Sequence, residues 1–365
     1  MKNTIGSAVT MTLFGESHGE QIGVVLDGLC PGVPVDEDAI AAQLALRRPF
    51  GAISTARREP DRFAITSGVF EGKTTGTPLC ILIPNEDKKS GDYDALRNVV
   101  RPGHADYTAL CKYHGFADPR GGGHFSGRLT APIVAAGAIL RAMLAQKGIV
   151  LGTHIARCAG TMDRDFEDLH ADLAALNGKR FAVLDEAAGE AMTAAIESAA
   201  AEGDSVGGVL ETAVLGVPAG VGEPWFDSVE GVLARALFAI PAVKGVEFGD
   251  GFGLSELRGS AANDAFAIED GRVVTRTNRC GGVGGGITNG MPIRFRTAIK
   301  PTPSIYRAQQ TVDVRTNTET TLSLSGRHDP AIVHRARVVV DAVTAFVLVD
   351  LLTGRYGTDW WMAQA

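Results

Sequence analysis

The sequence predicts an α+β fold in which helices and strands mix along the chain. Stretches with helical patterning are interspersed with short runs of β-branched residues that end at Gly or Pro. These runs do not follow a regular strand–helix alternation, which argues against a doubly wound sheet. The chain has 365 residues, which is long for a single core, so one large unit or two fused units are expected.

The first two helical patterns are residues 35–48 and 130–148. The former begins with acidic residues and ends with Arg47 and Arg48, so its charges suit the two ends of a helix dipole. The latter is almost wholly apolar and rich in alanine, which predicts a buried helix.

Two further helices and four strands complete the expected elements. Residues 185–203 are more polar and predict a surface helix. Residues 329–354 predict a helix with Pro330 near its first position and its end at Gly354. The strand-like runs are residues 62–70, 77–84, 207–218 and 291–299.

Two segments about half the chain length apart have similar sequences. Residues 23–34 and 207–218 align without a gap through shared Gly, Val, Leu and Pro, and a helical pattern follows each copy. Duplication and chance both explain such a match in a Gly- and Val-rich protein. Duplication would give a single domain over residues 1–365 made of two similar halves, about 1–180 and 190–350.

Composition excludes several classes of protein. The formal net charge of −7 gives no support to nucleic-acid binding. The five cysteines are scattered without a CxxC pair, so we expect reduced thiols, no zinc site and a cytoplasmic protein. No metal-ligand spacing such as H-E-x-x-H occurs. The N-terminus lacks a signal-peptide pattern, and the apolar run near the C-terminus is interrupted by Asp350, so no membrane segment is expected.

Arginines recur beside Pro or Gly, in segments that we interpret as loops. Arginine suits bidentate recognition of carboxylate and phosphate groups, so the set predicts a site for a small polyanion. For any one arginine, a surface salt bridge is the simpler interpretation. The set comprises Arg47, Arg48, Arg57, Arg58, Arg101, Arg128 and Arg327.

Three histidines lie in polar, turn-like contexts that suit general acids: His18, His104 and His328. Asp329 precedes Pro330 and lies two residues after Arg327. It therefore either caps a helix or acts as a base steered by a neighbouring cation. The remaining histidines considered are interpreted as structural or surface residues: His114, His154, His170 and His334.

Two glycine-containing motifs are weak signals. Residues 281–290 hold six glycines, which suit either close approach to a ligand or a bulged hairpin, but they do not match G-x-G-x-x-G. The Gly72-Lys73-Thr74 run imitates the end of a P-loop. Ser67 stands where that template needs glycine, and a strand rather than a helix follows, so a nucleotide-hydrolysing site is rejected.

Seven ordered blocks of sequence resemble the chorismate synthase family, over about residues 3 to 350. Their order and spacing are highly specific, although no single block is decisive. They are FGESHG, RREPD, SGVFEGKTTGTP, RPGHADYT, AVKGVEFGDGF, KPTPSI and GRHDP.

The resemblance implies a β-α-β sandwich with helices between two sheets, and a homotetramer. It implies an anti-1,4-elimination of phosphate from 5-enolpyruvylshikimate 3-phosphate, which gives chorismate for aromatic amino-acid biosynthesis. It associates the chain with FMN, FAD and NADP, of which reduced FMN is the expected cofactor, used without net redox change. A non-catalytic flavin- or anion-binding protein of the same fold is the competing interpretation, disfavoured because the implied catalytic residues are all present.

The resemblance also assigns roles to residues. His18 resembles the acid that protonates the departing phosphate, and His104 the acid beside the flavin N1 edge. Asp329, with Ser17, resembles the pair that moves a proton at the flavin N5 edge. The substrate arginines are Arg47, Arg128 and Arg327, followed by Arg48 and Arg57. The implied cofactor residues are His124, Phe125, Ser126, Ala242, Gly285, Lys300, Pro301, Thr302, Pro303, Ser304 and Arg327.

Three positions depart from the common pattern of the family. His124-Phe125-Ser126 replaces Arg-Ser-Ser after the triple glycine, so a fixed cation is lost there. Pro241 replaces a common Asn, and Ile53 stands where an Arg assigned to NADPH binding can occur. We therefore expect NADPH to act only indirectly, through a separate flavin reductase that supplies reduced FMN.

Overall fold

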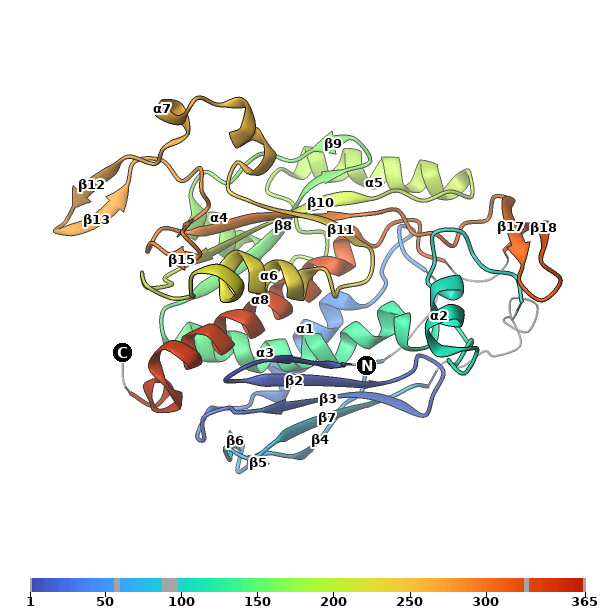
Figure 1. The fold of residues 1–365 in the computed structure, drawn as a ribbon, viewed down its shortest axis with the longest axis horizontal. Helices are drawn as coiled ribbons and strands as arrows, with labels where there is room; N and C mark the ends of the chain where they lie inside the picture. The colour runs from blue at the N-terminus through green and yellow to red at the C-terminus, as the bar shows by residue number, and fades with distance from the viewer. Residues whose placement is uncertain (1, 56–59, 87–97, 325–327, 364–365) are drawn as a thin grey trace.

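The computed structural model describes residues 2–55, 60–86, 98–324 and 328–363, and its fold is α+β as predicted (Figure 1). Two five-stranded antiparallel sheets organise it. The first sheet has the order β1 (Thr4–Gly6), β2 (Thr10–Gly15), β3 (Gln21–Asp27), β7 (Leu79–Pro84) and β4 (Ala64–Ser67). The second has the order β11 (Val243–Phe248), β16 (Ile293–Ile299), β10 (Gly208–Leu215), β8 (Val150–Cys158) and β9 (Thr161–Met162).

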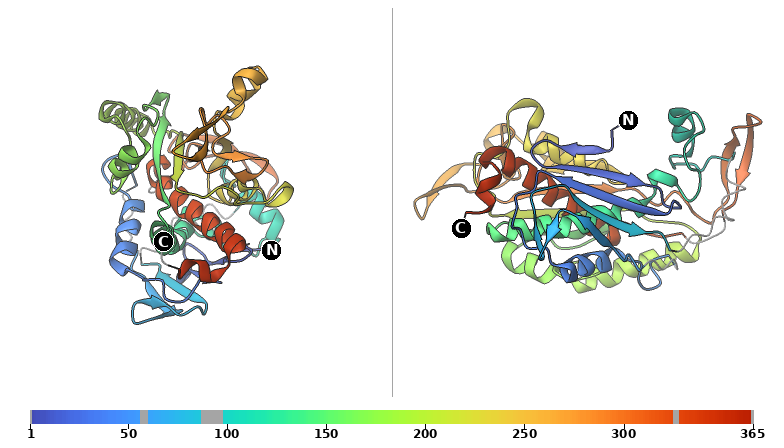
Figure 2. Two further views of the ribbon diagram at one scale, coloured as in Figure 1. Left: turned by 90° about the vertical axis from the view of Figure 1, so that its left-hand side faces the viewer. Right: turned by 90° about the horizontal axis from the view of Figure 1, so that it is seen from below.

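Helices lie between the two sheets in Figure 1, and Figure 2 shows the first sheet nearest the viewer when the molecule is seen from below. They are α1 (Glu37–Arg47), α3 (Thr130–Gln146), α6 (Val229–Leu237) and α8 (Val333–Tyr356). Helix α3 packs on β3 and β7, α8 packs on β8 and β10, and the two helices pack on each other. At their crossing, a Cβ atom on Gly137 would lie 2.3 Å from that of Ala342, so only glycine allows this approach.

Alternation along the strands explains which face of the first sheet is buried. Ile22, Val24 and Leu26 of β3 are fully buried, and these alternate residues share one face of the strand. Helix α3 is apolar almost all round, because it is enclosed by the sheet and by other helices.

The remaining elements lie outside this arrangement. Helix α4 (Leu169–Leu176) packs on β8, α5 (Glu186–Ala201) packs on β9, and α2 (Asp106–Tyr113) lies at the end of the molecule that also carries β17 and β18 (Figure 1). Short hairpins pair β5 (Val69–Phe70) with β6 (Lys73–Thr74), β12 (Phe266–Glu269) with β13 (Arg272–Thr275), β14 (Val283–Gly284) with β15 (Ile287–Thr288), and β17 (Gln309–Asp313) with β18 (Thr318–Leu322). The described residues also form short helices: α7 (Gly259–Ala262), η2 (Gly123–Phe125), η3 (Gly127–Leu129), η4 (Trp225–Asp227), η5 (Gly251–Glu256) and η6 (Thr358–Trp361).

All four predicted helices are present, but the bounds of α8 differ from the prediction. The carbonyl of Pro330 accepts a hydrogen bond from Val206 N at 2.8 Å, outside the helix, and α8 begins only at Val333. At the other end the helix continues through Gly354 and stops at Gly357, whose φ of 80° marks the chain reversal. Asp329 therefore does not cap α8: the N-cap residue is Ile332, which makes no side-chain cap bond.

The predicted strand over residues 62–70 is two strands. Gly68 has a φ of 81°, and it separates β4 from β5 because a left-handed residue interrupts an extended strand. The two segments of similar sequence, 23–34 and 207–218, contribute to β3 and β10, and each of these is the central strand of its sheet. The Gly72-Lys73-Thr74 run leads into strands, as the rejection of a P-loop requires.

Among the described residues, the helical segment Gly127–Gln146 is long and apolar enough to cross a membrane, judged by length and composition alone. However, 78% of its most apolar window is buried inside the protein. All five cysteines are free thiols.

Candidate active site

The loop between β2 and β3, residues 16–20, buries two polar side chains, those of Ser17 and His18. Ser17 is 0% exposed and His18 is 4% exposed, and the Ser17 hydroxyl lies 3.0 Å from His18 Nδ1. Gly19 N donates to Glu16 O at 3.0 Å, which closes a tight turn. At Gly15, with a φ of 99°, a Cβ atom would lie 2.5 Å from Gln21 O, so the turn requires glycine there. The segment is therefore a tight turn whose central serine and histidine are buried while Glu20 is exposed.

A glycine triplet, residues 121–123, runs between two of the predicted acids. A Cβ atom on Gly121 would lie 2.1 Å from His18 Cε1, and one on Gly122 would lie 3.6 Å from His104 Nε2. Ser17 N donates to Gly123 O at 3.1 Å, which ties the triplet to the β2–β3 loop. All three glycines have positive φ, which other residues rarely adopt. The triplet thus brings the loop of His18 and the loop of His104 together.

His104 is oriented by a carboxylate. Its Nδ1 donates to Asp106 Oδ1 at 2.6 Å, and Arg101 Nε donates to Asp106 Oδ2 at 2.7 Å. Burial alone would raise the pKa of Asp106, but the hydrogen bonds from Arg101 and His104 outweigh it and hold this pKa well below its ordinary value. An ionised Asp106 fixes the ring so that Nε2 is the nitrogen on the side of Gly122.

Three predicted substrate arginines meet at one buried carboxylate. The Asp61 side chain is 0% exposed; Arg47 Nη2 lies 3.1 Å from Asp61 Oδ2, and Arg128 Nη1 is paired with Oδ1. Arg48 Nε lies 3.8 Å from the same carboxylate. Burial would raise the pKa of Asp61, but the charges of Arg47 and Arg128 hold it below its ordinary value. Burial also lowers the pKa of Arg47 to about 10, against the opposing effect of Asp61.

Asp329 lies in a neighbouring network. Its Oδ1 accepts from Thr55 N at 2.9 Å, and its Oδ2 is 2.5 Å from Arg335 Nη1. Arg335 Nε in turn donates to Arg47 O at 2.8 Å, so Asp329 is linked to the helix that ends at Arg47. Within the described residues, the Ser17 hydroxyl is bonded instead to His18 and to a backbone carbonyl, so Ser17 and Asp329 are not in direct contact.

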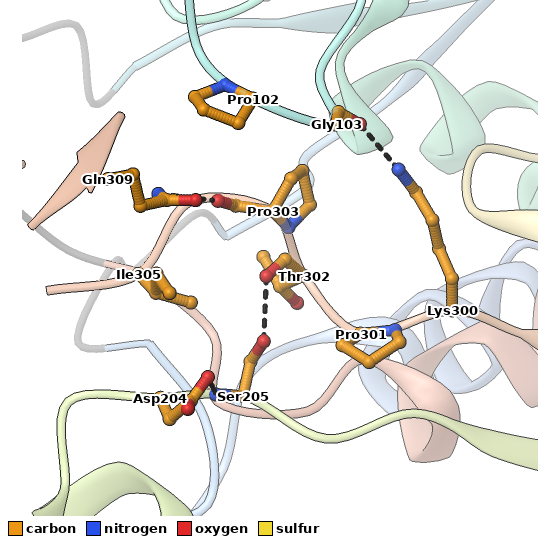
Figure 3. A pocket seen from close by; sticks show the side chains of 10 residues that line it. All are labelled: Pro102, Gly103, Asp204, Ser205, Lys300, Pro301, Thr302, Pro303, Ile305 and Gln309. Carbon is orange, nitrogen blue, oxygen red and sulfur yellow. Dashed lines mark hydrogen bonds between the residues drawn. The ribbon is translucent and has the colours of Figure 1, made fainter. Parts of the chain in front are cut away.

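A cavity of about 330 Å³ opens beside the segment before His104 (Figure 3). Lys300 Nζ donates to Gly103 O across it, and Ser205 Oγ donates to Thr302 O at 2.7 Å. Thr302 Oγ1 is buried and has no hydrogen-bond partner in the described structure. The cavity is lined by residues 102–103, 204–205, 300–303, Ile305 and Gln309.

Two other predicted cofactor residues lie at different distances from this cavity. Ala242 adopts a φ of 73°, and its carbonyl accepts from Lys300 N at 2.9 Å, so it adjoins the cavity wall. Gly285 lies in the β14–β15 hairpin, and Gly286 beside it accepts from Val229 N. Figure 1 shows that hairpin at the opposite end of the molecule from α2 and β17–β18.

A model of the family described as "Chorismate synthase" matches residues 9–353. The chain belongs to this family. Chorismate synthases are carbon–oxygen lyases that eliminate phosphate from 5-enolpyruvylshikimate 3-phosphate to give chorismate for aromatic amino-acid biosynthesis, with a reduced flavin as cofactor, and the activity of this chain is that of its family.

Known members of the chorismate synthase family resemble the chain over nearly their whole length. The chorismate synthase of Pyrococcus abyssi is 49% identical over 350 residues, which are 96% of this chain and 97% of that one. The enzyme of Thermococcus kodakarensis is 48% identical over 352 residues, with 96% and 97% covered. A crystal structure of a chorismate synthase matches with a TM-score of 0.78 at 28% identity, over 97% of this chain and 94% of that one.

The structure thus gathers most of the residues that the sequence singled out. Arg57, Arg58 and Arg327 lie outside the described residues. His124 Nδ1 donates to Gly15 O at 2.8 Å, at the base of the β2–β3 loop. Phe125 is partly exposed, and Ser126 Oγ accepts from Arg128 N at 3.2 Å. Pro301 and Pro303 line the cavity, and Ser304, next in the chain, is buried.

Sequence reasoning missed the residues that hold the site together: Asp61, Asn85, Asp106 and Gly121. Asp61 and Asp106 lie in the RREPD and RPGHADYT blocks, and the glycine triplet directly precedes His124. An acidic residue a few positions from a functional cation was the available signal. Asn85 carries no such signal, because its partners are distant in sequence.

Proposed function

We propose that His18 and His104 are the two acids of the elimination, acting on opposite sides of the 121–123 glycine triplet. His18 protonates the departing phosphate, and His104 holds a proton beside the cofactor. The observation that carries this proposal is the packing of the triplet: a Cβ atom on Gly121 would clash with the His18 ring, and one on Gly122 would be in van der Waals contact with the His104 ring, so the same short segment adjoins both imidazoles.

Arg47, Arg48 and Arg128 bind the phosphate and carboxylates of the substrate, together with Arg57 and Arg327. Their convergence on Asp61 supports this role, because guanidinium groups gathered at one buried point match a small ligand with several anionic groups. Asp329, with Ser17, is the pair that moves a proton beside the cofactor; the Ser17 hydroxyl is hydrogen-bonded to His18.

The reduced flavin is FMN, and residues 300–304 with Ala242, Ser126, Phe125 and His124 hold it. When bound, it lends electron density to a substrate ring whose C–H bond has no carbonyl to activate it. The cavity beside Gly103 fits such a group: its volume is at the lower end of small-molecule sites, Lys300 supplies a cation, and the buried Thr302 hydroxyl has an unused hydrogen bond. Gly285 contacts the cofactor only if this glycine comes from another subunit.

The acid assignment is tested with His104→Ala in an anaerobic assay of chorismate absorbance, using chemically reduced FMN. We expect turnover to be lost while FMN binding is retained. The matched control is His114→Asn, because His114 is an exposed histidine at the C-cap of α2, the helix that begins two residues after His104, and asparagine tolerates its φ of 53°. Turnover by His104→Ala at the wild-type rate would contradict the assignment.

The source of electrons is a separate flavin reductase, through which NADPH acts only indirectly. Oxidised FMN with NADPH in the same assay should give no chorismate until a reductase is added. Chorismate formed without a reductase would show that the chain reduces its own flavin.

The chain works as a cytoplasmic homotetramer with a β-α-β sandwich in each subunit, built from two duplicated halves. The exposed apolar residues of the β12–β13 hairpin support assembly: Phe266, Ile268 and Val273 are 73%, 69% and 63% exposed. The hairpin projects from the body of the molecule in Figure 1. Light scattering should give four times the mass of one chain, and Phe266→Asp should lower it.

A further inference from the structure

The side-chain amide of Asn85 joins the β2–β3 loop to Arg128. Asn85 follows β7 and is 5% exposed. Its Nδ2 donates to Glu16 O at 2.9 Å and to Gly19 O at 3.1 Å, and its Oδ1 accepts from Arg128 Nε at 3.0 Å. One side chain therefore spans both ends of the turn that carries the buried serine and histidine, and also the guanidinium group of a substrate arginine.

We propose that Asn85 is a positioning residue for the elimination: it fixes His18 relative to the substrate held by Arg128. This inference rests on the proposed roles of His18 and Arg128. Asn85 acts through these two residues and does not itself touch the reacting atoms. Its backbone N–H adds a third tie to the loop, because it donates to Glu20 O at 3.1 Å.

Only an asparagine satisfies all three side-chain bonds at this position. Its amide offers two N–H donors to two carbonyl groups and one carbonyl to a guanidinium N–H. An aspartate carboxylate would keep the bond to Arg128 but has no donor for Glu16 O and Gly19 O. Alanine would leave the loop carbonyls and Arg128 Nε without this partner, and buried polar groups are costly to leave unpaired.

The hydrogen bonds from Asn85 to the loop and its hydrogen bond to Arg128, which we call the loop arm and the arginine arm, are not equally replaceable. Arg128 is also held by Asp61 and by Pro84 O, the latter at 3.1 Å, so it stays in place when Asn85 is lost. The loop loses two hydrogen bonds at once. Damage to the loop should therefore appear in kcat, which depends on the acid, more than in KM, which depends on the arginines.

The first experiment compares Asn85→Ala, Asn85→Asp and wild type with reduced FMN under anaerobic conditions. We expect kcat to fall by about 10- to 100-fold in both variants, as for a catalytic group displaced by about 1 Å, with little change in KM. Asn278→Ala is the matched control, because its amide also donates to a backbone carbonyl, Pro292 O at 2.8 Å, but in another part of the protein. Wild-type kcat in Asn85→Asp would overturn the proposal, because that variant retains only the arginine arm.

The second experiment does not depend on activity. Diethyl pyrocarbonate modification of His18, followed by peptide mass spectrometry, should be several-fold faster in Asn85→Ala and Asn85→Asp than in wild type, since the loop opens more often. An unchanged rate would overturn the proposal even if kcat falls. The His18→Ala variant separates the two proposals. If it is fully active and the modification of His18 is still faster in the Asn85 variants, the acid assignment fails but the role of Asn85 in positioning the loop stands. If Asn85→Ala does not fold, the aspartate variant carries both measurements.

Discussion

Replacing Asp61 by asparagine should destabilise the protein strongly although the side chain keeps its shape. The Asp61 carboxylate is fully buried and pairs with Arg47 and Arg128, which are themselves buried. Removing one partner of a buried ion pair costs about 3–5 kcal/mol, because the other charge is left uncompensated. With an unfolding entropy of about 2.1 cal/mol/K per residue over this chain, the melting temperature should fall by about 4–7 °C.

Calorimetry at neutral pH measures this change. Asp165→Asn is the control, because Asp165 is exposed and should shift stability by no more than about 0.5 kcal/mol. Inorganic phosphate should raise the melting temperature of Asp61→Asn more than that of wild type, because an anion can replace the missing carboxylate between the guanidinium groups. A melting temperature equal to that of the control would refute the view that Asp61 compensates the arginine cluster.

Three further outcomes follow from the geometry. Gly121→Ala should abolish turnover in the anaerobic assay, since a Cβ atom would lie 2.1 Å from the ring of His18; full activity would contradict the packing of the triplet. Burial lowers the pKa of His334 to about 3, below its value in the unfolded chain. The neutral buried imidazole therefore contributes its full stability above about pH 6.5. This stability is lost as the pH falls, and the loss is about 2 kcal/mol at pH 5. Urea midpoints at pH 7 and pH 5 should show that loss in wild type but not in His334→Phe; equal losses would rule out His334 as its cause. His124→Ala should lower kcat, and a double-mutant cycle with Asn85→Ala should be non-additive, because both residues hold the same loop; strict additivity would mean that they act independently.

The helices were predictable where burial is continuous along the chain. Residues 130–148 are apolar on every face, and such a segment can be stable only when other elements enclose it. The ends of α8 were not predictable, because they depend on partners distant in sequence. Pro330 satisfies the local rule for a helix start, yet its carbonyl is already bonded to Val206 N from another segment.

The same distinction applies to the site. The sequence predicts roles for His18 and His104 because each lies beside glycine in a polar segment, a local signal. The partners that fix them were not found, because they arrive through strand pairing. Asn85 reaches the β2–β3 loop only because β3 pairs with β7 in a register that sets Gln21 opposite Pro84. No pattern within either segment encodes that register.

His124 shows how a departure from the family pattern gains a physical meaning only in the fold. From the sequence, an imidazole in place of an arginine was a lost cation at a cofactor loop. In the structure its Nδ1 bonds Gly15 O, the last carbonyl of β2. Gly123 and Asn85 bond the loop further along, so groups outside the turn satisfy its backbone N–H and carbonyl groups. Ser17 and His18 can therefore be buried on a polar loop because the hydrogen bonds of its backbone are made by neighbouring segments.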